Sequence, residues 1–204
     1  MNKFVSFLLI FFFITGSFAV AFSPVSASEL VENSWNTKTP MSQARGGLGV
    51  VVVDGKIYAI GGLSDDGVVG TNERYDPVSD KWITLSSMPT PRNNFAIAAY
   101  HGKIYCIGGT SETDVCTVNE VYDTLTDSWS IKKPFPSVER WLYAQVVNEQ
   151  IFVERFPMLY SYDPVKDTWS TKASMLIHPA SEPVCAVVGD QIWVTCRYLA
   201  GSPI

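Results

Sequence analysis

The chain has 204 residues, of which 47% are hydrophobic and 17% charged, with a formal net charge of −5 at pH 7. This composition is enough to bury a core. No cluster of Lys or Arg is present that could follow a phosphate backbone. We therefore predict that nucleic acid is not a partner.

The N-terminal residues have the layout of a secretory signal peptide. Lys3 is followed by an apolar run from Phe4 to Phe22 and then by small-residue sites, the second of which ends at Ala27. We predict cleavage after Ala27, which leaves residues 28–204 as the mature domain. Because the apolar run is also just long enough to cross a bilayer, a retained anchor for 1–27 is the alternative. Either way we expect a secreted or membrane-anchored protein with its repeats outside the cytoplasm.

A repeat of 47 residues follows. The segment DGKIYAIGG (Asp54 to Gly62) returns 47 residues later as HGKIYCIGG (His101 to Gly109). Other residues hold the same interval: Trp35, Trp82 and Trp129, Tyr75 and Tyr122, and Arg45 and Arg92. A fixed period of this length indicates an array of structural repeats.

Each repeat is predicted to form four short strands. The run GLGVVVVD (47–54) is apolar and β-branched, as expected for a strand buried on both faces. Asp54-Gly55 then predicts a two-residue hairpin turn into 56–62. A polar loop leads to a third strand in 71–77, and a tight turn to a fourth in 81–85. Such a sheet completes its core only by stacking on neighbours, and radial stacking gives an all-β propeller.

The unit resembles the kelch motif. A double glycine closes the second strand, a tyrosine lies on the third and a tryptophan on the fourth. The residues that carry this resemblance are Gly61, Gly62, Tyr75, Trp82, Gly108, Gly109, Tyr122, Trp129, Tyr162 and Trp169. The resemblance implies a kelch-type β-propeller segment of four-stranded antiparallel blades. We expect the glycines to allow close backbone approach, and Tyr and Trp to fill the seam between adjacent blades.

The chain accommodates about three blades and parts of others. We expect blades over about 47–87, 94–134 and 141–174, the inner half of a fourth over 181–197, and the outer strand of a preceding blade over 33–38. In the third blade Arg155-Phe156 replaces the glycines, and the loop between its second and third strands must be nearly absent. Similar propellers usually close with six or seven blades. The chain is therefore expected to be a fragment, one part of an assembly of several chains, or an open arc, whose blade faces would drive self-association.

The residues of catalysis and metal binding are sparse. The two histidines, His101 and His178, fall in different contexts, and His101 is expected to be a turn residue. The recurring acidic pairs are expected to be turn and capping residues rather than calcium ligands: Asp76 with Asp80, Asp123 with Asp127, and Asp163 with Asp167. No cofactor and no metal site are predicted.

The four cysteines leave their redox state open. An exported protein invites disulfides, but Cys185 should face Val194 across a hairpin, so it is only diagonal to Cys196 and poorly placed to bond it. For most of Cys106, Cys116, Cys185 and Cys196 we expect small buried hydrophobic side chains.

Because residues for catalysis and metal binding are sparse, the sequence favours a binding surface. If strands alternate in direction, the loops between second and third strands share one rim with the connections between blades. The candidate binding residues on this rim are Arg45, Asp65, Asp66, Arg92, Glu112, Asp114, Arg140 and Trp141. The alternative for Arg45 and Arg92 is a structural pairing with a carboxylate such as Glu73 or Glu120. Arg140 and Trp141 fall outside the repeated registers, which makes them the more specific candidates.

The sequence therefore favours an extracytoplasmic binding or scaffold module for a protein or glycan partner. The alternative is part of a sugar-active kelch enzyme, similar to sialic acid mutarotases or galactose oxidase.

Overall fold

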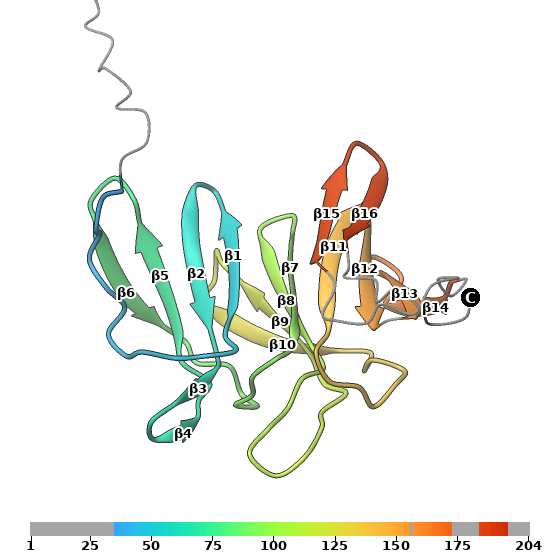
Figure 1. The fold of residues 1–204 in the computed structure, drawn as a ribbon, viewed down its shortest axis with the longest axis horizontal. Helices are drawn as coiled ribbons and strands as arrows, with labels where there is room; N and C mark the ends of the chain where they lie inside the picture. Colours follow the sequence, from blue (N-terminus) through green and yellow to red (C-terminus); the bar gives the residue numbers. More distant parts are fainter. Residues whose placement is uncertain (1–34, 156, 173–183, 196–204) are drawn as a thin grey trace, which may run out of the picture. The chain divides into compact units, whose positions relative to one another are not determined.

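The computed structural model describes residues 35–155, 157–172 and 184–195, and all regular structure within them is β (Figure 1). The chain divides into a unit that ends at Thr37 and a second unit from Lys38 to Ile204. The fold that follows is that of the second unit. The predicted signal segment, residues 1–27, lies outside the described residues.

Three four-stranded antiparallel sheets follow one another along the chain, and we call them blades 1 to 3. Blade 1 has the order β1-β2-β5-β6, with strands Gly49–Val53, Lys56–Ile60, Asn72–Asp76 and Lys81–Leu85. Blade 2 is β7 to β10, Ala96–Tyr100, Lys103–Ile107, Asn119–Asp123 and Ser128–Lys132. Blade 3 is β11 to β14, Tyr143–Val147, Gln150–Arg155, Met158–Asp163 and Thr168–Thr171. A hairpin follows, β15 (Val184–Val188) and β16 (Gln191–Thr195), and a small hairpin of β3 (Leu63–Ser64) and β4 (Gly67–Val68) projects from blade 1.

The predicted tight turns between first and second strands are confirmed. Asp54 and Gly55 have φ of 48° and 70°, and His101 and Gly102 have 47° and 71°. This pair of positive values suits the right-handed twist of the strands that it joins. The polar side chain of Asp or His and the missing Cβ of Gly let the chain adopt it.

The double glycines also behave as predicted. Gly61 and Gly109 have positive φ, and a Cβ at either one would lie 2.6 Å from a backbone carbonyl oxygen, that of Arg92 or of Asn93. No side chain fits there, so these glycines let the chain between two blades run against the end of the second strand.

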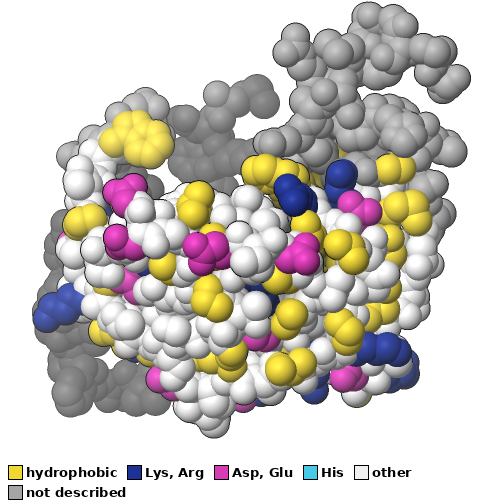
Figure 2. Space-filling model, turned by 90° about the horizontal axis from the view of Figure 1, so that it is seen from below, with side chains coloured by type: hydrophobic (Ala, Val, Ile, Leu, Met, Phe, Trp, Pro, Cys, Tyr) yellow, Lys and Arg dark blue, Asp and Glu magenta, His cyan; other side chains and the backbone are white. Residues whose placement is uncertain are grey.

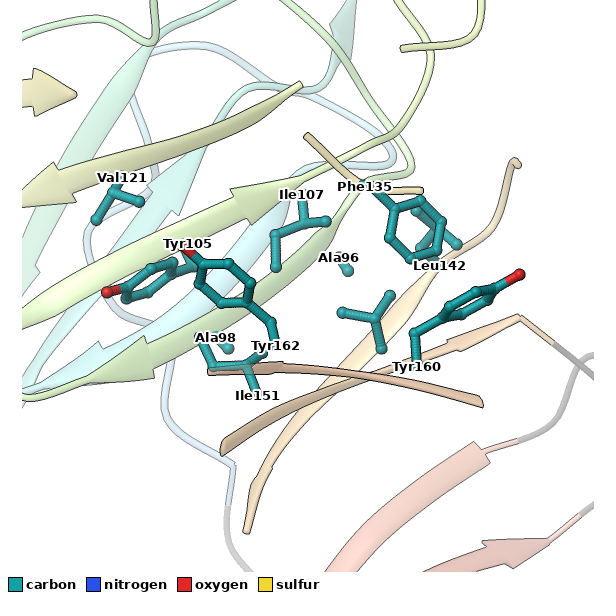
Figure 3. Close-up of a cluster of buried hydrophobic side chains, with 11 residues drawn as sticks. Ala96, Ala98, Tyr105, Ile107, Val121, Phe135, Leu142, Ile151, Tyr160 and Tyr162 are labelled. Atoms are coloured by element: carbon teal, nitrogen blue, oxygen red, sulfur yellow. The ribbon is translucent and has the colours of Figure 1, made fainter. Parts of the chain in front are cut away.

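The two faces of blade 2 pack against different neighbours. In blade 2, Phe95, Ile104, Cys106 and Tyr122 join Tyr58 and other residues of blade 1 in one core. The opposite face of blade 2 contributes Ala96, Ala98, Tyr105, Ile107 and Val121 to a second core, whose other side is Ile151, Val153, Tyr160 and Tyr162 of blade 3 (Figure 3). Each seam therefore joins two blades through apolar side chains.

The prediction that β1 is buried on both faces is wrong. Val53 is buried and Gly49 lies against Phe95 and Ile97 of blade 2, but the side chains of Val50 and Val52 are 54% and 59% exposed. Alternate residues of a strand point to opposite faces, and only one face of β1 meets another blade in the described residues.

Tyrosine and tryptophan occupy the seams, as predicted. The rings of Tyr58 and Tyr122 lie 6.2 Å apart across the first seam, and those of Tyr105 and Tyr162 lie 5.9 Å apart across the second. Figure 3 shows the second pair side by side. On the third and fourth strands, Tyr122 packs against Trp129 at 5.1 Å and Tyr162 against Trp169 at 4.8 Å.

The connection between blades is fixed to both of its neighbours by hydrogen bonds. The carbonyl oxygen of Ser86 accepts from Asn72 Nδ2 of its own blade at 3.3 Å and from Trp129 Nε1 of the next at 2.7 Å. The amide of Ser86 donates to Asp127 Oδ1 at 2.9 Å, and the same oxygen accepts from the Tyr122 hydroxyl at 2.7 Å. Lys133 makes the equivalent bonds with Asn119, Trp169 and Asp167. We call this arrangement the connector clamp.

The segment before blade 1 makes the two clamp bonds that lead to the following blade, without forming a strand. The Thr39 amide donates to Asp80 Oδ1 at 3.0 Å and its carbonyl accepts from Trp82 Nε1 at 2.8 Å. Within the predicted outer strand 33–38, residues 33 and 34 lie outside the described residues, and 35–38 form no strand.

Blade 3 departs from the repeat as predicted. Residues 156 and 157 alone connect β12 to β13, so the long loop of the other blades is missing. The shorter loop leaves Glu154 in the position of Ile60 and Ile107, where it is only 2% exposed. Neither of its carboxylate oxygens has a hydrogen-bond partner of ordinary geometry in the described residues, and the Cys185 thiol of β15 faces it as a weak donor.

This carboxyl makes stability depend on pH. Burial raises the pKa of Glu154 above its ordinary value, although the thiol partly offsets the effect. The folded chain therefore keeps the proton when the unfolded chain has lost it. The free energy of unfolding must fall as the pH rises from the ordinary glutamate pKa, near 4.5, toward the raised value.

We predict that Glu154→Gln raises the melting temperature at pH 7 more than at pH 4, because the amide cannot ionise. Glu149→Gln is the control, since hydrogen bonds from His101 and Tyr100 lower the pKa of the exposed Glu149 carboxyl and its removal should not stabilise the fold at pH 7. Equal shifts for Glu154→Gln at both pH values would contradict this account. Thermal unfolding followed by circular dichroism gives the melting-temperature shift of each variant from the parent at both pH values.

Candidate functional site

The loops that follow the second strands and the connections between blades lie on one side of the sheets, as predicted. Figure 1 shows β3–β4, the loop after β8 and the connection before β11 at the lower edge, with the tight turn between β1 and β2 at the upper edge. We call the lower edge the loop rim. Asn93 of one connection pairs with Thr110 of the neighbouring loop, and Gly46 pairs with Leu63 in the same way. The rim therefore has a hydrogen-bonded base.

Two of the predicted rim residues do not reach solvent. Arg92 is fully buried, forms an ion pair with Glu120, and donates from Nη2 to the Cys106 carbonyl at 2.8 Å. Arg45 is 9% exposed and pairs with Glu73 at 2.8 Å. The structural alternative for these arginines is therefore the right one, and their assignment as binding residues is wrong. An arginine at the base of a seam satisfies backbone carbonyls that would otherwise be buried without a donor.

The carboxylate of Glu73 stays ionised in this setting. Burial raises its pKa, but hydrogen bonds from Ser42 and Arg45 outweigh burial, and the pKa of Glu73 lies below its ordinary value. Thr90 donates to Glu120 as Ser42 donates to Glu73, so the ion pair and its hydroxyl recur in both repeats.

The acidic rim residues are exposed on neighbouring loops. Asp65 and Asp66 form the tip of β3–β4, and Glu112 and Asp114 lie on the loop between β8 and β9. The two loops approach one another, since a Cβ at Gly67 would lie 4.0 Å from Glu112 Oε1. Part of this acidity serves the loops themselves: Asp114 Oδ1 accepts from the Val115 amide, and Asp66 accepts from Gln43. Figure 2 shows acidic and hydrophobic side chains interspersed on the underside of the view in Figure 1.

The prediction that Trp141 falls outside the repeated registers is wrong, because its backbone occupies a repeated position. Gly47, Asn94 and Trp141 precede the first strands of the three blades at intervals of 47 residues, and their φ values are 60°, 51° and 59°. Gly and Asn are the residues that adopt this left-handed conformation most readily, whereas a bulky side chain pays for it in strain. Trp141 is nevertheless present, and its side chain is 52% exposed.

These three residues line one hollow on the loop rim. It has a volume of about 410 Å³ and is bounded by 47–50 of blade 1, by Asn94, Phe95 and Ile97 of blade 2, and by 141–145 of blade 3. The hollow lies where the first strands of the three blades begin. Trp141 thus presents half of its surface beside an opening to which three blades contribute, while Arg140 next to it is also exposed.

Arg140 is displaced by one residue from the arginine of the other repeats, as its sequence position indicated. Glu139 stands in the place of Arg45 and Arg92, and its carboxylate pairs with Arg155 at 3.3 Å. Blade 3 therefore lacks the buried Arg–Glu pair, which leaves Arg140 on the rim.

The other polar candidates have structural roles. His101 is at the tip of its hairpin and pairs with Glu149 at 2.8 Å. Each acidic pair caps its turn: Asp76, Asp123 and Asp163 accept from backbone amides two residues on, and Asp80, Asp127 and Asp167 belong to the clamps.

Cys106, Cys116 and Cys185 are free thiols. Cys106 is fully buried, and burial raises its pKa to about 12; Cys116 and Cys185 are only partly buried. Cys185 faces Val194 as predicted. Cys196 and His178 lie outside the described residues.

No group of three or more His, Cys, Asp or Glu side chains suited to a metal ion occurs among the described residues. In the same ranges, no helix is long and apolar enough to cross a membrane.

The sheets define the chain as a segment of a β-propeller, with four-stranded blades joined face to face and their longer loops on one rim. Comparison with family models then specifies the repeats: residues 44–89 and 91–136 each match the kelch motif. The chain carries kelch repeats in tandem, as its glycines, tyrosines and tryptophans indicated. Blade 3 and β15–β16 fall outside the matched ranges. A search of the curated proteins finds no match.

The buried ion pair gives a test of the structural role of Arg92. Removing the guanidinium leaves the Glu120 carboxylate buried without its cation, so we predict that Arg92→Met lowers the free energy of unfolding by about 3–5 kcal/mol. The double variant Arg92→Met with Glu120→Leu should lose less than the single one, because no charge is then left buried. Denaturant unfolding of the three chains measures this. A rim-binding role would instead leave stability within about 0.5 kcal/mol of the parent, as for ordinary surface changes.

Proposed function

We propose that this chain is an extracytoplasmic protein-binding module that contacts its partner through the loop rim around Trp141. Two kelch motifs support a binding role, because repeat scaffolds of this kind present loops for recognition on a rigid base. The observation that carries the proposal is Trp141 itself, a half-exposed tryptophan in the left-handed backbone region beside a hollow.

Strain and exposure together favour a functional reason for this tryptophan. In the other two repeats the position is filled by Gly47 and Asn94, which fit the backbone at lower cost. Tryptophan and arginine are also the residues most enriched at the energetic centres of protein interfaces, where they enter pockets of the partner or cover its apolar side chains. Arg140 and Trp141 lie next to each other on the rim.

The charge of the rim suggests the kind of partner. Asp65, Asp66 and Glu112 are exposed on adjacent loops, and the chain is acidic overall. We infer a partner that places an apolar side chain against Trp141 and basic side chains near the acidic loops, since complementary charge speeds association and selects among partners.

Export rests on the sequence, with its apolar run from Phe4 to Phe22 and the site that ends at Ala27. Recovery from outside the cell of a chain that begins at Ser28 is the result expected for cleavage. A sugar-active enzyme is the second candidate, and the described residues offer no observation that favours it.

We predict that Trp141→Asn separates stability from binding. Asn is the residue of the equivalent position in blade 2, so the substitution should leave stability unchanged or raise it by about 1 kcal/mol as strain is relieved. Peptides selected from a displayed random library on the parent chain should be enriched in basic residues and should bind the variant at least tenfold more weakly.

Val165→Asn is the control, because Val165 is 82% exposed in the turn between β13 and β14, away from the hollow. Equal peptide binding by parent and Trp141→Asn would contradict the proposal. Binding to immobilised neutral glycans in place of peptides, lost in the same variant, would keep the site but replace the protein partner by a glycan.

A further inference from the structure

Two exposed apolar faces remain, of which only Val50 also borders the hollow on the loop rim. The first, which we call the head face, is the side of blade 1 that bears Val50, Val52 and Ile57. The second, the tail face, is the side of β15–β16 that bears Ala186, Val188 and Trp193. Val188 and Trp193 are 62% and 57% exposed. Large apolar side chains gathered on one face of a sheet indicate an interaction surface.

The tail face carries an aromatic side chain at a strand position that is buried in blades 1 and 2. Counted from the tight turns, Trp193 takes the place of Tyr58 in blade 1 and Tyr105 in blade 2. Those tyrosines are each only 3% exposed, because each packs against the tyrosine of the next blade. Trp193 is the same kind of seam residue without a blade against it in the described residues.

The head face is the matching half of such a seam. Val50 and Val52 take the places of Ile97 and Ala99 in blade 2, both of which pack in the core between blades 1 and 2. The connector clamp is already formed beside this face, since Thr39 bonds Asp80 and Trp82 as Ser86 bonds Asp127 and Trp129. What the head face lacks, among the described residues, is the inner strands of a blade that present a tail face.

Within one chain the two faces do not meet. Blade 1 packs on blade 2, blade 2 on blade 3, and Glu154 of blade 3 faces Cys185 of β15. The head and tail faces therefore lie at opposite ends of this row and point away from it.

We propose that a second copy of this chain is the occupant: the tail face of one copy docks on the head face of another, with Trp193 against blade 1 near Ile57 and Tyr75. The interface is head-to-tail, so each copy uses two different surfaces. Two copies can close on each other into a ring, or further copies can add to form a longer array.

Each face can be disrupted separately by one substitution. Val52→Glu places a carboxylate on the head face and Trp193→Glu places one on the tail face. Both side chains are more than half exposed, so neither variant should disturb the fold, which circular dichroism checks. Val50→Lys and Val188→Lys are second variants on the same faces. Val78→Glu is the control, since Val78 is 92% exposed in the turn between β5 and β6.

Sedimentation velocity on the full chain, purified as the expressing cell delivers it, tests the proposal. The parent and the Val78→Glu chain should sediment as dimers or larger species that grow with concentration. Val52→Glu and Trp193→Glu should each be monomeric. An equimolar mixture of these two variants should form complexes of two chains and no more, because one working head and one working tail remain.

Four results would overturn the proposal. The parent is monomeric at the highest concentration that it tolerates. Association survives in Trp193→Glu while Val52→Glu abolishes it, which means that head faces pair with each other. Association survives in both variants, which assigns it to another part of the chain such as residues 1–34. The two variants are monomeric but fail to recombine, which means that the head and tail faces do not bind each other.

Discussion

The fold depends on one constraint: a four-stranded sheet has two faces, and each needs a neighbour. The connector clamp solves this with the same few groups at both seams between complete blades in the described residues. One carbonyl, that of Ser86 or Lys133, accepts from an asparagine of its own blade and from a tryptophan of the next, while its amide is held by an aspartate. The aspartate in turn accepts from a buried tyrosine. Polar groups of the connection are thereby satisfied at the place where two apolar faces close.

The sequence was sufficient for this architecture because the groups that build it are local and recur in register. The Asp54-Gly55 turn, the double glycines and the Tyr and Trp positions each require a particular residue type for a stated reason, and each was found where the 47-residue interval placed it. The kelch resemblance rested on the same residues and is confirmed by the two matched motifs. The shortened third blade followed from the interval of 40 residues, in place of 47, that separates Tyr122 from Tyr162 and Trp129 from Trp169.

Other features depend on information that a single sequence does not carry. The apolar run 47–54 predicts a strand buried on both faces, yet Val50 and Val52 are exposed. Hydrophobicity alone does not decide burial, because an apolar face is buried only where a neighbour packs against it. The left-handed backbone of Trp141 was missed since its residue type argues against it; alignment with Gly47 and Asn94 would have found it. The sequence placed Arg45 and Arg92 at the correct edge of the sheets, the loop rim. Their burial could not be predicted, because it depends on glutamate partners about 28 residues away.

The departures from the repeat divide into two kinds. The first kind lies at the seams and comprises Glu154, the head face and the tail face. There a changed or missing neighbour alters stability or association. Trp141 and Arg140 concern the loop rim, where a residue that costs backbone strain is exposed beside a hollow. Natural sequences keep local conflicts of the second kind mainly where they serve a function.

Hydrogen exchange read by mass spectrometry, at a concentration where the chain is monomeric, tests the central claim that seams and not single sheets hold the structure. Blade 2 has a complete blade on both faces, so peptides covering β8 and β9 should exchange most slowly; blades 1 and 3 should follow, and β15–β16 should exchange first. Equal protection in all three blades, or slowest exchange in β15–β16, would show that each sheet is stable by itself and would contradict the account.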